Sequence, residues 1–262
     1  MFEDSMMDDG MIGCPDIQAD FCEQQIFDDN CAVVAETSII NQFRPDANLD
    51  QTTAAYISAT NGWYQPDAGT DPNVIGNLMD EFGIGNHTNT CATASDLAWE
   101  LQQGHGVIVG VNSAELWDTG PLADLKHELI KSCGLDNPAF TPANHAVTVT
   151  GIDVSDPDNP MVTINDSGVG ATVSYPLEKF VDAWENSNCF YVATNDPLPT
   201  LQDCKESLSG FWGASKYGDV GEPSIWSDIA NVAKPAAAIL GGVAGIATGI
   251  HMLENSDFAR TI

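Results

Sequence analysis

The stretch QIFDDNCAVVAETSIINQF, residues 25–43, determines how the rest of the chain is interpreted. From Cys31 onward its apolar residues recur at helical spacing, and Asp28, Asp29 or Asn30 can cap the first turn. The pattern predicts a helix over 31–43. Cys31 is its first residue, and unpaired backbone N–H groups and the helix dipole stabilise a thiolate there. Cys31 is therefore a candidate nucleophile, although a lone cysteine at a helix start is more often a packing residue.

The segments that follow predict helices first and strands later. Helices are expected over residues 51–60, 73–82, 97–103, 122–131 and 177–185, from apolar periodicity and from Asp, Pro and Gly at their ends. A continuous β-branched run over 107–111 predicts a strand buried on both faces. Further strands are expected over 145–153, 161–166, 171–175 and 189–193, the first two as a hairpin. This order predicts an α+β fold.

The charge of the chain excludes one class of partner. The 262 residues carry 38 Asp and Glu against 8 Lys and Arg, a formal net charge of −30 with His neutral. So few cations cannot neutralise a run of phosphates, so we expect no nucleic-acid binding, and an anionic membrane would repel the protein. Since 43% of the residues are apolar and six are Trp, the chain is expected to fold. The acidity either serves solubility or favours a basic substrate, and composition does not choose between them.

The chain divides into four predicted parts: an irregular acidic lead-in over 1–23, one domain over 24–197, a linker over 198–223, and a Gly/Ala-rich extension over 224–262. The lead-in lacks the pattern of a secretory signal peptide, so we expect a cytoplasmic protein or export without a cleavable signal. Residues 235–250 are uncharged, with small residues at every fourth position. A bilayer span needs about 20 apolar residues, so a helix packed on a protein partner or on the domain is favoured over a membrane span.

No cofactor or metal is expected. None of the seven cysteines forms a Cys-x-x-Cys pair, so a structural zinc site lacks its usual spacing. Asp153, Asp156 and Asp158 do not have the spacing of an EF-hand loop, which favours a hydrated turn over a calcium site.

His145 is the best candidate among five histidines for a partner of Cys31. It opens the alternating strand over 145–153 and shares a face with Val147 and Val149, where a titratable group needs a partner or a role. Asp166 ends the next strand on its apolar face, whereas Asn165 points the other way. If the two strands pair, His145 and Asp166 can meet at one end of that face, as a base and its orienting acid.

Acyl transfer also needs hydrogen-bond donors for the oxyanion. Gln25 precedes Cys31 by six residues, so its side-chain amide could join the backbone N–H of Cys31 in that task. The adjacent Gln24 is the alternative.

These residues occur in a chain that resembles papain-like cysteine peptidases of the bacteriocin-processing, double-glycine type, in a stand-alone form without a transporter. The similarity covers roughly residues 24–194 and keeps the family's order. Its segments are QIFDDNCAVVAETSIINQF, GTDPNVIGNLMDEFGI, DLAWELQQGHGVIVGVN, NHAVTVTGIDV, PMVTINDSG and YPLEKFVDAWEN. The resemblance implies a papain-like fold with Cys31 as nucleophile, His145 as base, Asp166 as orienter and Gln25 in the oxyanion hole. The family commonly has Gly after the nucleophile, where this chain has Ala32, and this change bears on access to the thiol.

The sequence thus predicts a thiol-dependent peptidase that acts on a peptide or protein substrate, basic or neutral in charge. Transfer of the acyl group to an amine instead of water would use the same residues. The alternative is a catalytically silent papain-like module that uses its acidic surface and C-terminal helix for assembly.

Overall fold

The computed structural model of the protein describes residues 10–118, 120–135, 138–139 and 141–201. Seven strands form a sheet in the order β4-β9-β5-β6-β7-β8, with β1 added to β6, and every pair is antiparallel. The sheet strands are β1 (Met11–Gly13), β4 (Asn86–Asn89), β5 (Val107–Val111), β6 (His145–Asp153), β7 (Met161–Asp166), β8 (Ala171–Pro176) and β9 (Tyr191–Thr194). A separate small hairpin pairs β2 (Tyr64–Gln65) with β3 (Gly69–Thr70).

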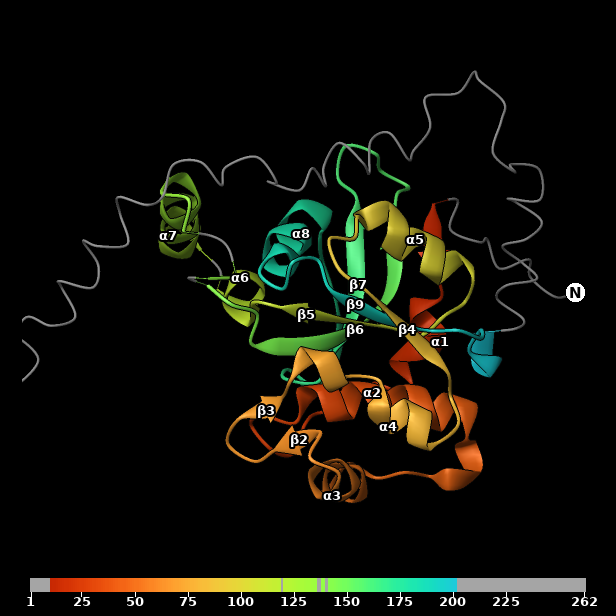
Figure 1. Ribbon diagram of the computed structural model, residues 1–262. Coiled ribbons are helices and arrows are strands. Elements are labelled where there is room, and N and C mark those ends of the chain that lie inside the picture. Colours follow the sequence, from red (N-terminus) through yellow and green to blue (C-terminus); the bar gives the residue numbers. More distant parts are fainter. Residues whose placement is uncertain (1–9, 119, 136–137, 140, 202–262) are drawn as a thin grey trace, which may run out of the picture.

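Helices cover both faces of the sheet (Figure 1). They are α1 (Pro15–Ala19), α2 (Cys31–Phe43), α3 (Gln51–Thr60), α4 (Asn77–Glu81), α5 (Ala94–Gln102), α6 (Ser113–Trp117), α7 (Pro121–Ser132) and α8 (Leu177–Glu185). Single 3-10 turns lie at Pro45–Ala47, Pro72–Val74 and Pro199–Leu201. Figure 1 shows α5 and α8 on one side of the sheet and α2, α3 and α4 on the other. The α+β class predicted from the sequence is confirmed.

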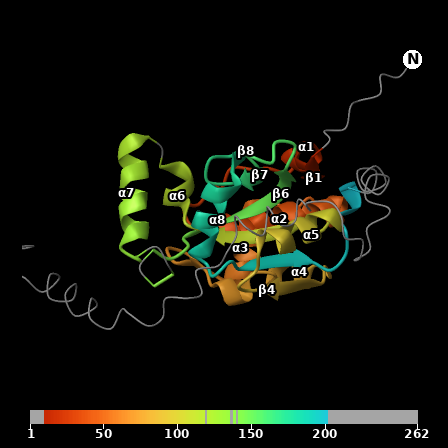
Figure 2. The same cartoon turned by 90° about the horizontal axis from the view of Figure 1, so that it is seen from above.

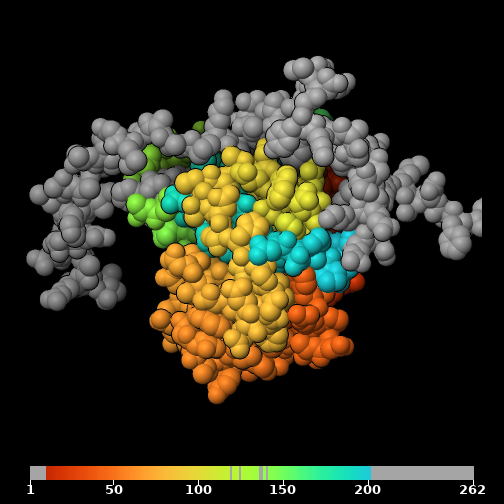
Figure 3. Space-filling view, turned by 45° about the vertical axis from the view of Figure 1, so that its right-hand side comes forward, coloured from red at the N-terminus to blue at the C-terminus, as the bar shows by residue number. Residues whose placement is uncertain are grey.

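Each face of the sheet has its own hydrophobic core. Val107, Val109 and Val111 of β5 pack in the core that α5 and α8 complete. Ile108 points to the opposite face and packs in the core built by α2, α3 and α4. Successive side chains of a strand alternate between faces, so a strand covered on both sides must be apolar throughout. This explains the continuous run in β5. Figure 3 shows the second core's elements, in orange, as a lobe below the elements coloured yellow to cyan.

The predicted hairpin of β6 and β7 is present. Val149 pairs with Ile164 and Thr148 with Asn165, and the register shifts between Val149 and Gly151. The helices predicted over 31–43, 51–60 and 177–185 have the bounds of α2, α3 and α8.

The single helix predicted over 73–82 is wrong, because the chain forms a 3-10 turn and then the short helix α4. The break lies at Gly76, whose φ of 106° is left-handed. The buried carboxylate of Glu36 on α2 accepts hydrogen bonds from the backbone N–H groups of Gly76, Leu78 and Met79 at 3.0, 3.1 and 3.3 Å. It thereby caps α4 from another helix, a long-range contact that local periodicity does not reveal.

Six short elements are absent from the sequence prediction, and two of them are the strands of the small hairpin β2–β3. Strand β1 and helix α1 lie in the segment predicted as an irregular lead-in, where β1 pairs with β6. Strand β4 pairs with β9, and helix α6 lies in the polar connector after β5. Each has five residues or fewer, too few for a periodic pattern. The last strand, predicted over 189–193, begins at Tyr191 because Asn188 and Cys189 have φ of 59° and 49° and cannot be extended.

Helix α7 stands at the edge of the molecule next to α6 in both views (Figures 1 and 2). No helix among the described residues is long and apolar enough to cross a bilayer. The linker predicted over 198–223 is described only to residue 201, and the extension predicted over 224–262 lies outside the described residues.

Candidate active site

Cys31 is the first residue of α2, and its sulfur faces the start of β6. The backbone N–H of Ala146 donates to Sγ of Cys31 at 3.3 Å. The preceding Asn30 is fully buried, and its Oδ1 accepts from the N–H of Phe27 at 3.3 Å, which fixes the turn into the helix. Since Cys31 opens the helix, its own N–H has no helical carbonyl to bond and remains available as a donor.

His145 and Asp166 meet as the strand pattern predicted. Nε2 of His145 lies 2.7 Å from Oδ1 of Asp166, and both side chains are buried. The side chain of His145 also forms a hydrogen bond with the side chain of Cys31. Because Nε2 is occupied by Asp166, Nδ1 is the ring nitrogen left for the thiol. The structure therefore brings Cys31, His145 and Asp166 into one line of hydrogen bonds.

The electrostatics of this line favour an ion pair. Burial alone would raise the pKa of Cys31, but the hydrogen bond and positive charge of His145, with the N–H groups of Ala146 and Ala32, lower it below its ordinary value. Burial alone would lower the pKa of His145, but its bonds with Asp166 and Cys31 raise it to about 9. The pKa of Asp166 is lowered because the His145 and Trp117 bonds outweigh burial. These shifts all favour the form of the site with a thiolate on Cys31, an imidazolium on His145 and a carboxylate on Asp166.

Trp117, at the end of α6, is a site residue that sequence reasoning missed. Its Nε1–H donates to Oδ2 of Asp166 at 2.8 Å, and its ring lies 5.1 Å from that of His145 at an angle of 60°. The N–H of Gly168 donates to Oδ1 of Asp166 at 2.9 Å. Asp166 therefore has a donor on each oxygen besides His145, and its orientation is fixed.

The position of Trp117 depends on two further residues. A Cβ added at Gly168 would lie 2.6 Å from Cζ2 and 2.7 Å from Cη2 of Trp117, so only glycine leaves room for the indole. Nζ of Lys179 on α8 donates to the carbonyl oxygens of Leu116 and Asp118 at 3.1 and 3.4 Å. These bonds hold the backbone on both sides of Trp117.

Gln25 lies in the loop before α2, beside the turn that follows Asp166. Its Nε2 donates to the carbonyl oxygen of Phe27 at 2.8 Å, and its Oε1 accepts from Oγ of Ser167 at 3.0 Å. The backbone N–H of Gln25 also donates to the carbonyl oxygen of Ser167 at 2.9 Å. The described contacts of Gln25 are therefore with Phe27 and Ser167 and not with Cys31, but one N–H of its amide is still available.

Gln51, the first residue of α3, holds the same loop by hydrogen bonds. Its Nε2 donates to the carbonyl oxygen of Gln24 and to Oε2 of Glu23 at 2.8 and 3.0 Å, and its Oε1 accepts from the N–H of Ile26 at 3.1 Å. A side chain from α3 thus positions the backbone around Gln25.

Ala32 stands where the papain-like peptidases that the sequence resembles commonly have a glycine, directly after the nucleophile. It is 3% exposed and packs in the core formed by α2, α3 and α4. Its methyl group is therefore covered by the protein and does not narrow the open side of the thiol.

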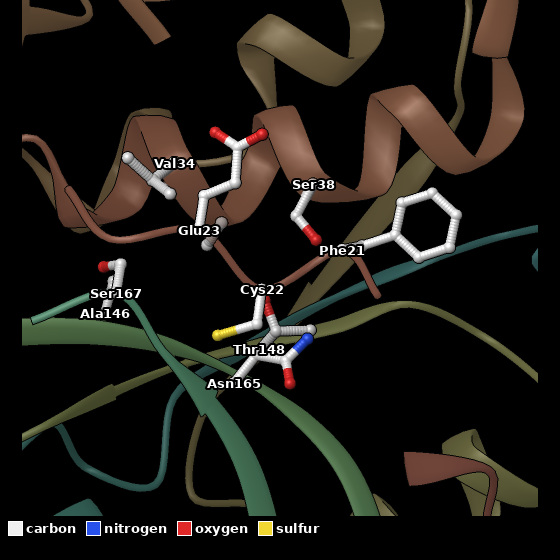
Figure 4. Close-up of a pocket in the computed structure, with 10 residues that line it drawn as sticks. Phe21, Cys22, Glu23, Val34, Ser38, Ala146, Thr148, Asn165 and Ser167 are labelled. Carbon is white, nitrogen blue, oxygen red and sulfur yellow. The ribbon is translucent and has the colours of Figure 1, made fainter. Parts of the chain in front are cut away.

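A small pocket lies next to the site, between α2 and the strands β6 and β7 (Figure 4). Cys22, Val34, Ser38, Thr148 and Asn165 are among the side chains that line it. Burial raises the pKa of Cys22, so this thiol is chemically unlike Cys31. Burial likewise raises the pKa of Cys189 to about 12. Among the described residues, no three His, Cys, Asp or Glu side chains are grouped so that they could hold a metal ion.

Proteins of known sequence and structure resemble this chain. The family model described as the Peptidase_C39 like family matches residues 17–192. Uncharacterized proteins of Mycobacterium bovis and Mycobacterium tuberculosis are each 29% identical to this chain over 210 residues, which cover 70% of this chain and 84% of theirs. The crystal structure of a proposed C39-like peptidase from Bacillus anthracis aligns with a TM-score of 0.48 and 15% identity, over 72% of this chain and 100% of that one.

Proposed function

Because this chain belongs to the Peptidase_C39 like family, we propose that it is a cysteine peptidase with Cys31 as its nucleophile. The observation that carries the proposal is the buried line from Cys31 through His145 to Asp166, with the pKa of Cys31 lowered and that of His145 raised. A structural cysteine buried in apolar surroundings would instead have a raised pKa, as Cys22 and Cys189 have.

The proposed reaction begins with attack of the Cys31 thiolate on a peptide carbonyl carbon, which forms a C–S bond and places negative charge on the carbonyl oxygen. The backbone N–H of Cys31 and the side-chain amide of Gln25 donate hydrogen bonds to this oxyanion. As the tetrahedral intermediate collapses, the C–N bond breaks and the His145 imidazolium gives its proton to the leaving amine.

Water then hydrolyses the thioester. Neutral His145 takes a proton from the attacking water, the carboxylic acid product leaves, and the Cys31 thiolate and the His145 imidazolium are restored. Asp166 keeps the imidazole in the tautomer that presents Nδ1 to the thiol and stabilises the imidazolium. Trp117 and Gly168 act on the reaction through Asp166, as positioning residues.

We further propose that substrates are neutral or basic peptides, because the net charge of −30 raises the local concentration of cations and disfavours anions.

The test is incubation of the full chain with a proteome-derived peptide library, followed by mass spectrometry of the products. We expect new peptide ends with the wild type and none with Cys31→Ala. Circular dichroism should show that both proteins are folded. His145→Ala should lower the cleavage rate by about a thousandfold, since it removes both thiolate stabilisation and the proton donor. Cys133→Ala, which removes an exposed free thiol elsewhere, is the matched control and should cleave as the wild type does.

Cleavage that persists in Cys31→Ala would refute the proposed nucleophile. A wild type that cuts no peptide of the library would refute peptidase activity and favour the silent module.

A further inference from the structure

Several large apolar side chains are exposed on the segments that carry the proposed nucleophile and its partners. Nine such side chains are exposed among the described residues, and four of them flank the site. They are Ile26, Phe27, Trp117 and Val169, with exposed fractions of 57%, 41%, 42% and 47%. The first two lie in the loop between Gln25 and the helix. Trp117 ends α6, and Val169 follows Gly168, the glycine of the turn after Asp166 that packs against the Trp117 indole.

The positions of the leaving amine and of the oxyanion assign the pair Trp117 and Val169 and the pair Ile26 and Phe27 to different parts of a substrate. The leaving amine must approach Nδ1 of His145 to receive its proton. The side chain attached to that amine then extends past the imidazole, and the Trp117 ring lies there, 5.1 Å from the ring of His145. Ile26 and Phe27 instead follow Gln25 directly, next to the position of the oxyanion in the proposed reaction.

The exposed surface of Trp117 is preorganised in the protein without substrate. The indole is held by its bond to Asp166, by the close approach of Gly168 and by the Lys179 bonds to the backbone on either side. A rigid apolar surface loses little entropy when it binds a side chain.

We infer that Trp117 and Val169 form the subsite for the residue on the carboxyl side of the cleaved bond, and that this subsite selects an apolar side chain. The inference rests on the proposed peptidase activity and adds the class of residue that follows the cut. The peptides preferred would carry Leu, Ile, Val, Met or Phe at that position.

The same peptide-library experiment tests the subsite through the residue that follows each new cut. We expect the wild type to enrich large apolar residues there by about tenfold over Gly, Asp and Glu, the discrimination typical of an apolar pocket for a few methylene groups. Val169→Ser should reduce this enrichment by about threefold, and Trp117→Phe should keep most of it because the ring remains. Trp117→Ala should abolish it.

Leu129→Ser is the matched control, because Leu129 is an exposed apolar residue on α7 and no part of the subsite. It should leave the enrichment unchanged. Cleavage without an apolar preference at this position, or with the same preference in Val169→Ser and Trp117→Ala, would overturn the subsite and leave the peptidase proposal standing. Absence of any cleavage by the wild type would overturn both.

Discussion

At the scale of single residues, the site depends on a glycine as much as on its reactive groups. Gly168 has an ordinary backbone conformation, so alanine would fit its φ and ψ, but not the space that Trp117 occupies. The indole donates to Asp166, which in turn orients His145. A single methyl group at position 168 is therefore expected to act on the nucleophile through three side chains.

We predict that Gly168→Ala destabilises the fold by about 2 kcal/mol, the usual cost of overpacking, and slows alkylation of Cys31 near neutral pH. Chemical denaturation and timed mass spectrometry measure the two effects. In a Trp117→Ala background the same substitution should cost much less, because only the contact of the added Cβ with Oδ1 of Asp166, at 3.2 Å, remains. An equal cost in both backgrounds would show that the indole is not what position 168 must accommodate.

Several site residues could be predicted from the sequence, and the reasons are local. Cys31 begins the helix that apolar periodicity predicts, although the expected side-chain cap from Asp28, Asp29 or Asn30 is absent. His145 and Asp166 lie on the apolar faces of two strands that pair, so alternation alone places them together. Trp117 gave no such signal, because α6 has only five residues and its contact with Asp166 spans 49 positions. The contact of Gln25 with Ser167, 142 positions away, likewise has no local signal in the sequence.

At the scale of elements, Glu36 connects the nucleophile's helix to α4. It lies on α2 and accepts three backbone hydrogen bonds from residues 76–79. Desolvation is the largest influence on this carboxyl, and despite the hydrogen bonds that oppose it the pKa is raised from 4.5 to about 7. Ionisation of Glu36 is thus a cost that the folded protein bears and the unfolded chain does not.

The sign of the pH effect follows from that shift. The folded state keeps the Glu36 proton up to about pH 7, whereas the unfolded state loses it near pH 4.5. The contribution of Glu36 to the free energy of unfolding is therefore fully present below pH 4.5 and is lost as the pH rises through 7. Relative to Glu36→Gln, which does not titrate, the wild type should lose about 3 kcal/mol of unfolding free energy between pH 4 and pH 8.

Urea denaturation of both proteins at several pH values measures this difference. A gap between the two proteins that stays constant with pH, or that widens in favour of the wild type as the pH rises, would contradict the assignment.

The long elements were predictable and the short ones were not. Helices α2, α3 and α8 and strands β5, β6 and β7 each repeat a pattern often enough to be recognised, and their bounds match. Strands β1 and β4 gain their stability from pairing with β6 and β9, so nothing in their own few residues predicts them. The break at Gly76 likewise depends on Glu36, 40 residues away.

At the scale of the whole molecule, the chain is strongly acidic, but few of its acidic residues take part in the proposed reaction. Of the 38 acidic residues only Asp166 belongs to the proposed reaction, so the rest act at a distance through the field they create. Such a field is screened within about 10 Å at 0.1 M salt. Its influence on reagents that reach Cys31 should therefore depend on ionic strength.

We predict that a cationic methanethiosulfonate reagent modifies Cys31 roughly ten times faster than its anionic analogue at low salt, and that the ratio approaches one in 1 M salt. A neutral methyl reagent is the control and should show no salt dependence. A ratio below one, or one that salt does not change, would return the charge to a role in solubility alone.

The most direct measurement of the central claim is the pH dependence of Cys31 alkylation by iodoacetamide, followed at each cysteine by mass spectrometry. At pH 6 the wild-type Cys31 should react faster than the exposed Cys133, because its lowered pKa leaves more of it as the reactive thiolate. In His145→Ala this advantage should vanish, and the reaction should need a pH near the ordinary pKa of a thiol. A Cys31 that reacts no faster than Cys133 at pH 6, or equally fast with and without His145, would contradict the account.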